Sequence, residues 1–320
     1  MPTSSNAHPP VRITSYPDFC RVIPLMLGFR PHDSLVLVVI SDRTMAMAAR
    51  FDLPHTGEVA IEVARQCADL ADRHDADEVV LIGYTDTPGD LWGLLDQVDT
   101  GLGEVPVHLL VTDHRHYWQG PDDPGTALPE NDVPGAGALA GRPILDSRDE
   151  LADTVAGPNR VTDEICSVMA STEQFNAHLT VPEQMSLLHE LIREYLGTPV
   201  EVSLQSRLLA AALVDDPFVR EHARLSINRR NAAGHVPLWQ QVVDVTPDEI
   251  ATGPLCLLAM AAWMSGHGAL MQVCLERAEW LSPDDEMVTY LTMLARSAAD
   301  PRTWEGWPDV HESWRDDAVS

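Results

Sequence analysis

The stretch Pro254–Pro283 reads PLCLLAMAAWMSGHGALMQVCLERAEWLSP, and it decides the fold of the C-terminal part of the chain. Small or apolar residues recur at helical spacing on both sides of Gly266, namely at Leu258, Ala262, Met271, Leu275 and Ala278. Pro283 closes the second run, because proline cannot continue a helix. The stretch therefore predicts two antiparallel helices joined by a tight glycine turn, with alanine where the helices must approach closely.

The sequence around this hairpin is also typical of helices. From Val181 onward every periodic stretch has helical spacing, and the further predicted helices are Val181–Leu196, Ser203–Val214, Asp216–Asn228, Leu238–Val243 and Asp284–Ala298. The hairpin resembles a tetratricopeptide-type repeat. Pro247 follows Trp239 and Val243 much as Pro283 follows its own helix, which indicates a degraded repeat before the clear one. Such hairpins usually stack and bind partners rather than catalyse.

The first part of the chain alternates strand-like and helix-like stretches. Continuous apolar runs at Ser34–Ile40 and Glu78–Tyr84 predict buried strands, and the amphipathic stretch Glu58–His74 predicts a helix. The other predicted elements are a strand at Val11–Ser15, a helix at Pro17–Phe29 with a kink or end at Pro24, a strand at Met45–Leu53 after the turn 41–44, a helix at Asp90–Val98, a strand at Val105–Thr112, and helices at Ser147–Glu150 and Thr162–Thr172. This order predicts a sheet with at least one parallel pair and an antiparallel hairpin.

The predicted architecture is thus a mixed β-sheet with flanking helices, of the α/β or α+β class, followed by an all-helical tetratricopeptide-like domain. We expect the first domain to span residues 1–158 and the helical domain residues 159–308, with a tail at 309–320. Residues 120–141 read GPDDPGTALPENDVPGAGALAG. This composition predicts an irregular excursion or lid that holds no regular element.

The charge balance excludes several mechanisms. The 320-residue chain has a formal net charge of −28, and all 21 of its basic residues are arginine. Without lysine there is no Walker-type phosphate loop and no Schiff-base nucleophile. The negative field repels phosphates, so we expect no direct nucleic-acid binding. A GC-rich coding bias accounts for the missing lysine, and a solvated surface, salt adaptation or mimicry of nucleic acid would each account for the acidity.

The cysteines and the hydropathy pattern indicate a cytoplasmic protein. Five cysteines are widely spaced and never form a CxxC pair, which favours reduced and mostly buried thiols. No apolar run approaches the roughly 20 residues of a membrane-spanning helix. The first ten residues, MPTSSNAHPP, show no secretory signal.

Several motifs together carry a family resemblance. They are VIPLMLGFRPHDSLVLV at Val22–Val38, RFDLP at Arg50–Pro54, LDSRDELADTVAG at Leu145–Gly157, and the segment Leu255–Trp304 with AAWMSGHGALMQVCLERA and DPRTW. With them the chain resembles the domain-of-unknown-function 4192 family of actinobacteria and their phages. That resemblance implies an N-terminal α/β part and a C-terminal helical part, and no known activity. The family's usual cysteine-bearing stretch appears here as HYWQGPDDPGTALP, without cysteine.

Three acidic residues form the first candidate site. Asp52, Asp86 and Asp113 each fall at or just after the end of a predicted strand. Ligands of open α/β sheets gather outside the carboxyl ends of the strands, and three carboxylates there could hold a hard cation. The alternative is that these residues start turns, for which aspartate is well suited.

The segment Asp113–His116 is the second candidate. On a strand, His114 and His116 would point to one face and could bind one zinc ion together. No third ligand is visible nearby, and the alternative is a pair of surface histidines at the end of a strand. We predict no cofactor, with a divalent cation as the one ligand that the sequence leaves open.

The sequence carries no recognisable catalytic signature. The leading hypothesis is a cytoplasmic binding or scaffold protein that recognises another protein or peptide through the helical domain, without contact to a membrane. The second is an enzyme or a small-ligand or metal sensor in the α/β domain. The third is an acidic decoy of nucleic acid for a DNA- or RNA-binding protein. The sequence does not determine the oligomeric state.

Overall fold

The computed structural model describes residues 13, 15–54, 57–130, 133, 144–197, 201–299 and 301. The chain divides into two compact units, Met1–Arg148 and Asp149–Ser320, here called the α/β unit and the helical unit. The predicted boundary between residues 158 and 159 lies after the first helix of the helical unit. Most of the predicted Val11–Ser15 strand, the DPRTW motif and the predicted tail lie outside the described residues.

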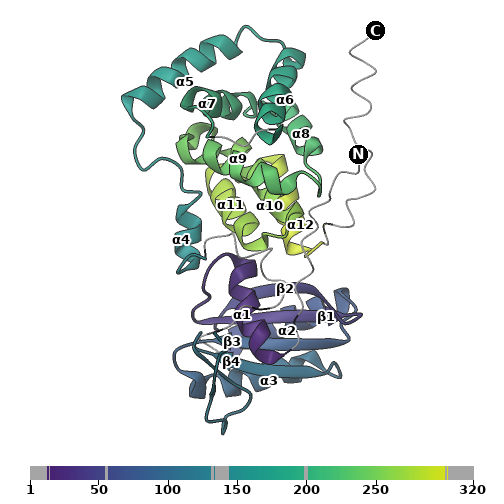
Figure 1. Cartoon of the computed structure of the whole chain (residues 1–320). Helices are drawn as coiled ribbons and strands as arrows, with labels where there is room; N and C mark the ends of the chain where they lie inside the picture. The colour runs from purple at the N-terminus through teal and green to yellow at the C-terminus, as the bar shows by residue number, and fades with distance from the viewer. Residues whose placement is uncertain are drawn as a thin grey trace, which may run out of the picture. The chain divides into compact units, whose positions relative to one another are not determined.

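The α/β unit alternates helices and strands along the chain (Figure 1). Its elements are α1 (Tyr16–Leu27), β1 (Ser34–Ser41), β2 (Thr44–Asp52), α2 (Gly57–Arg73), β3 (Glu78–Tyr84), η1 (Pro88–Asp90), α3 (Trp92–Leu102), β4 (Val107–Thr112), β5 (His116–Trp118) and β6 (Thr126–Ala127). The strands form one mixed sheet in the order β2-β1-β3-β4-β5-β6. The pair β3–β4 is parallel and β1–β2 is an antiparallel hairpin, which confirms both predicted pairings.

Two short strands at the end of this sheet were not predicted. β6 lies inside residues 120–141, so the prediction that this stretch holds no regular element is wrong. Thr126 and Ala127 pair with Tyr117 and His116 of β5. Strand pairing uses only backbone groups, so two residues at a sheet edge can form it without any periodic side-chain pattern. Gly135 and Gly137 of the same stretch lie outside the described residues.

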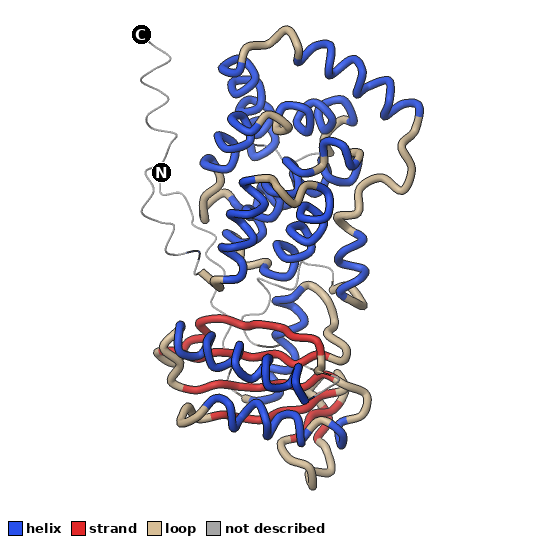
Figure 2. The backbone as a smooth tube through the Cα atoms, turned by 180° about the vertical axis from the view of Figure 1, so that it is seen from behind, coloured by secondary structure: helices blue, strands red, loops and turns tan. Residues whose placement is uncertain are grey.

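The sheet is covered by helices on both faces. Leu35 and Leu37 of β1 pack in a cluster with residues of α2 and α3, whereas Val36 and Val38 pack with residues of α1. Figure 2 shows α2 and α3 in front of the sheet, on the side opposite α1. Strands buried on both faces need apolar side chains at every position, which explains the unbroken run in β1. Each fully buried valine or leucine contributes about 1.5–3 kcal/mol.

Helix α1 continues through Pro24 and ends just before Gly28, which has a φ of 80°. Pro24 has no N–H to give to the carbonyl oxygen of Cys20, four residues earlier. The buried hydroxyl of Tyr84 on β3 donates to that oxygen instead, at 3.1 Å. A tertiary hydrogen bond thus satisfies the acceptor that proline leaves open, and the helix extends past the residue where the sequence predicted a kink or an end.

The helical unit contains only helices and loops within its described residues (Figure 1). They are α4 (Arg148–Asp153), α5 (Asp163–Asn176), α6 (Val181–Gly197), α7 (Leu204–Leu213), α8 (Pro217–Ser226), α9 (Ala232–Val245), η3 (Asp248–Ile250), α10 (Thr252–Met264), α11 (Gly268–Leu281) and α12 (Glu286–Arg296). An N-terminal mixed sheet followed by a helical region is the fold class that the sequence predicts. Helix α9 is longer than the predicted Leu238–Val243, because it continues through Pro237.

The α10–α11 hairpin contains a completely buried helix. Every residue of α10 is buried, and α10 packs against α9 and α11. Gly266 turns the chain with a φ of 78°, and the N–H of His267 donates to the carbonyl oxygen of Ala262 at 2.7 Å. Ala278 on α11 has no exposed surface. The predicted pair of helices with a glycine turn is confirmed.

Candidate functional site

The register of the sheet places the predicted acidic residues on the side of the sheet where β2, β3 and β4 end. This side is here called the sheet edge. Ser34 at the start of β1 pairs with Asp52 on one side and with Tyr84 on the other, and Tyr84 pairs with Thr112. The ends of β2, β3 and β4 therefore meet at this edge. Asp113 follows β4 directly and Asp86 lies two residues after β3, so both lie at the same edge as Asp52.

The carboxylates at this edge do not converge on a common point. Asp52 is 83% exposed and pairs with Arg50 at 2.7 Å. Asp113 accepts the backbone N–H groups of Arg115 at 2.8 Å and of His116 at 2.5 Å, which makes it a turn former. Asp86 is exposed. Within the ranges that the structure describes, no group of three or more His, Cys, Asp or Glu side chains is arranged to hold a metal ion.

The two candidate histidines do not share a strand. His114 lies in the turn between β4 and β5 with a φ of 71°, and His116 is the first residue of β5. The predicted placement on one strand face is wrong because this left-handed residue reverses the chain. The Nε2 atom of His114 is 2.8 Å from the carbonyl oxygen of Pro31, while Nδ1 of His116 is 3.3 Å from Asp113.

Two pKa shifts mark the β4–β5 turn. Burial lowers the pKa of His114, and the nearby charges of His32 and Arg30 lower it further, whereas the contact with Pro31 opposes the shift. Burial alone would raise the pKa of Asp113, but the hydrogen bonds that it accepts from Arg115 and His116 outweigh burial and lower it. The lowered pKa of Asp113 thus follows from hydrogen bonds within the turn, whereas that of His114 follows mainly from burial.

The buried polar groups next to this edge also bond to one another. The Oγ of Ser34 donates to the carbonyl oxygen of His32 at 2.6 Å and accepts from Nε of Arg50 at 2.9 Å. The hydroxyl of Thr112 donates to the carbonyl oxygen of His116 at 2.7 Å. This network fixes the entry of the chain into β1 and leaves those hydroxyls little capacity to bind a ligand.

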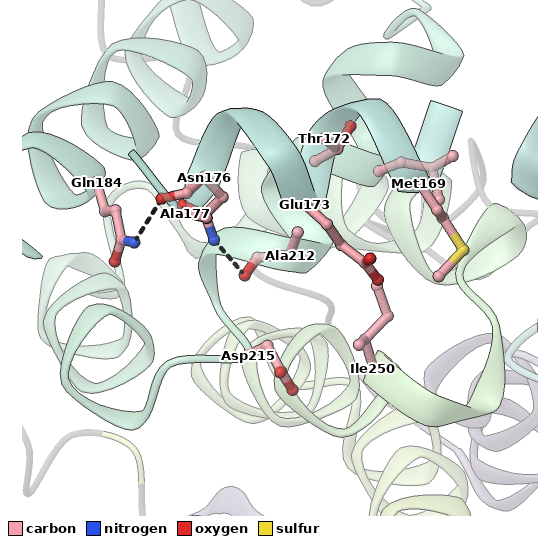
Figure 3. A pocket seen from close by; sticks show the side chains of 10 residues that line it. Met169, Thr172, Glu173, Asn176, Ala177, Gln184, Ala212, Asp215 and Ile250 are labelled. Atoms are coloured by element: carbon pink, nitrogen blue, oxygen red, sulfur yellow. Dashed lines mark hydrogen bonds between the residues drawn. The ribbon is translucent and has the colours of Figure 1, made fainter. Parts of the chain in front are cut away.

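A pocket in the helical unit has a different character. It lies among α5, α6, α7 and η3 and has a volume of about 290 Å³ (Figure 3). Its lining residues are Met169, Thr172, Glu173, Asn176, Ala177, Gln184, Leu208, Ala212, Asp215 and Ile250. Helix α5 provides four of them, from Met169 to Asn176, and Ala177 follows this helix directly. The pocket therefore has one wall made by a single helix and a second wall assembled from three other elements.

Two amide side chains in this pocket have oxygen atoms without partners. The Nδ2 of Asn176 donates to the carbonyl oxygen of Ala212 at 3.3 Å, and Nε2 of Gln184 donates to the carbonyl oxygen of Asn176 at 3.5 Å (Figure 3). These contacts identify the nitrogen of each amide, because a carbonyl oxygen can only accept. The remaining atoms, Oδ1 of Asn176 and Oε1 of Gln184, are buried and accept no hydrogen bond. Buried acceptors left unpaired are uncommon in native proteins.

Two carboxylates complete the polar lining. Figure 3 shows the side chain of Glu173 extending from α5 toward Ile250. Asp215 lies in the connection between α7 and α8. Partial burial raises the pKa of Asp215, the charge of Arg220 opposes that shift, and the charge of Asp216 adds to it. Arg220 itself is bound to Asp285 at 2.6 Å.

The sequence analysis did not single out these pocket residues. Thr172 and Glu173 precede Asn176 on α5 by four and three residues, so the sequence could have shown one polar face on this helix. The partners of that face lie on other helices at no fixed sequence separation. Only the folded helical unit brings them together.

The fold and its sites define a class: a mixed α/β unit followed by a helical unit, with no recognisable catalytic arrangement among the described residues. The chain belongs to the family called Domain of unknown function (DUF4192), whose sequence profile matches residues 18–302. The family prediction is confirmed, and the match includes residues of both units. No curated protein and no solved structure was found to match the chain. None of the described helices is both long enough and apolar enough to cross a membrane.

Proposed function

We propose that this protein binds another protein or peptide through its helical unit. The observation that carries the proposal is the pocket of Figure 3, whose lining combines apolar side chains with two carboxylates and two buried amide oxygens that have no partner. Concave sites with a few convergent polar groups are the usual form of a binding site. Among the helices that line the pocket, α7 packs on both α5 and α6, and α6 and α7 also pack on α9, which supports the pocket wall.

We also propose that the helical hairpins are tetratricopeptide-like. Support comes from the α10–α11 pair, which has its turn at Gly266, a buried Ala278 on the second helix and Pro283 just after it. Repeats of this kind bury a continuous core by stacking and bind partners on the concave surface that the stack creates. The buried α10 and the pocket-lining α5 and α6 fit that division of roles.

The charge of the chain indicates the kind of partner. With a net charge of −28, the protein attracts a basic surface over long range and repels nucleic-acid phosphates. We therefore propose a basic protein or peptide as the partner. The alternative of an enzyme or sensor at the sheet edge has weaker support, because the polar groups there bond mainly to one another.

A site-specific photocrosslinker tests the proposal in the full-length chain. A benzophenone amino acid replaces Ala177, which lines the pocket and is exposed, or Gln97 on α3, an exposed position of the α/β unit. After illumination in the native host, we expect a defined crosslinked protein from position 177 and none from position 97. Crosslinks from position 97 alone, or from neither position, would contradict binding through the helical unit.

A further inference from the structure

We infer that the pocket among α5, α6, α7 and η3 holds the guanidinium group of an arginine side chain that a partner protein presents. This inference rests on the proposed function, since the partner supplies the arginine. It adds the chemical identity of the bound group. The argument depends on which atoms the pocket offers to a ligand, on its apolar lining and on its size.

Apart from the hydroxyl of Thr172, which can donate or accept, the polar groups that the pocket leaves for a ligand are hydrogen-bond acceptors. Oδ1 of Asn176 and Oε1 of Gln184 are amide oxygens whose nitrogens are already engaged. Glu173 and Asp215 add carboxylates, which accept and do not donate when ionised. A complementary ligand therefore carries several N–H donors and a positive charge. Anionic ligands are excluded by the same groups.

The remaining lining suits an aliphatic stem. Met169, Leu208, Ala212 and Ile250 are apolar and border the same space. Long cationic side chains bury their methylene groups on such surfaces and keep the charged head among polar atoms. The volume of about 290 Å³ lies near the lower end of the range of about 300–1,000 Å³ for ligand pockets. One long side chain fits this space better than a complete small-molecule ligand.

The number and placement of the acceptors favour arginine over lysine. A guanidinium group has five N–H donors in a rigid plane, whereas an ammonium group has three donors around one nitrogen. The acceptors come from α5, α6 and the α7–α8 connection, so they approach the ligand from separate sides. The nearby Arg220 does not line the pocket, and its Nη2 atom donates to Asp285 at 2.6 Å.

Four peptides and one methyl reporter test the inference with the full-length chain. The protein is labelled with ¹³C-methyl methionine, so that Met169 reports on the pocket. The peptides are acetyl-Gly-Ala-Xaa-Ala-Gly-amide, where Xaa is arginine, lysine, citrulline or norleucine. Titrations run at constant ionic strength, since the net charge of −28 attracts any cation weakly. We expect a saturable shift of the Met169 signal with the arginine peptide, weaker binding of the lysine peptide, and no binding of the other two.

Charge-neutralising variants show where the peptide binds. Glu173→Gln and Asp215→Asn should each weaken the arginine peptide about tenfold, the usual loss for one charge-assisted hydrogen bond. Glu194→Gln is the matched control, because Glu194 is an exposed acid on α6 that does not line the pocket. Equal affinity for citrulline or norleucine, tighter binding of lysine, no shift at Met169, or an equal loss in Glu194→Gln would each overturn the inference. A protein that still crosslinks at position 177 would then leave the proposed function standing without the arginine.

Discussion

The sheet edge of the α/β unit and the pocket of the helical unit differ in whether their polar groups have hydrogen-bond partners. At the sheet edge, Ser34, Arg50 and Asp113 all find partners within the unit. In the pocket, the amide oxygens of Asn176 and Gln184 find none. Asp113, which the sequence singles out, thus holds a turn together, whereas Asn176 and Gln184, which it does not single out, have unpaired oxygen atoms.

The largest expected effect concerns whether the two units fold independently. Trp239 is fully buried on α9, so Trp239→Ala should destabilise the helical unit by about 3–5 kcal/mol. Trp280→Ala is the matched control, because Trp280 is 76% exposed and its loss should change stability by no more than about 0.5 kcal/mol. Hydrogen exchange should show loss of protection in α10 and none in β3. An equal loss of protection in β3 would mean that both units unfold as one.

A fragment that begins near Val181 tests the same independence directly. We expect it to melt cooperatively by circular dichroism, and a non-cooperative, coil-like melt would contradict independent folding.

The second test concerns packing within the helical unit. Ala278 is fully buried on α11, so Ala278→Leu should overpack the hairpin and cost about 1–3 kcal/mol. Ala170→Leu on the exposed surface of α5 serves as the control for adding the same side chain to a helix. The measurement is the melting temperature of the helical unit. An equal effect of both variants would show that α11 is not closely packed at position 278.

The third test uses the lowered pKa of His114 in the α/β unit. Because the folded pKa lies below its ordinary value of 6.5, the unfolded chain takes up the proton first as the pH falls. The unit should therefore be most stable above that value and lose stability as the pH falls from there through the folded pKa. His114→Gln should remove this dependence. Chemical denaturation between pH 7.5 and 5 measures it, and an unchanged profile in the variant would assign it to other groups.

The smallest expected effect is that of a divalent cation on the sheet edge. If Asp86 and Asp113 are turn formers, MgCl₂ should raise the melting temperature no more than NaCl at matched ionic strength, because screening is not specific to a site. A bound cation would instead stabilise the folded state by mass action. A gain specific to magnesium that disappears in Asp113→Asn would reverse the comparison and favour the α/β unit as the ligand-binding part.

The sequence predicted elements best where one pattern determines them. The continuous apolar runs of β1 and β3 and the α10–α11 hairpin were placed within one or two residues of their observed ends. Prediction from the sequence failed where a contact between residues distant in sequence determines the local structure. Tyr84 supports the helix through Pro24, and the pairing of β5 with β6 needs no side-chain pattern. The histidine pair was misplaced because one left-handed residue changes the direction of every following side chain.

The sequence by itself determined the fold class, the family and the acidic, lysine-free character of this protein, because composition and local periodicity are written in consecutive residues. It also indicated which acids follow strands. Only the tertiary structure decided that these acids do not converge and that Glu173, Gln184 and Asp215 line one pocket. The reason is that ligand geometry depends on how separate elements pack, and helix packing joins residues at separations that no sequence period specifies.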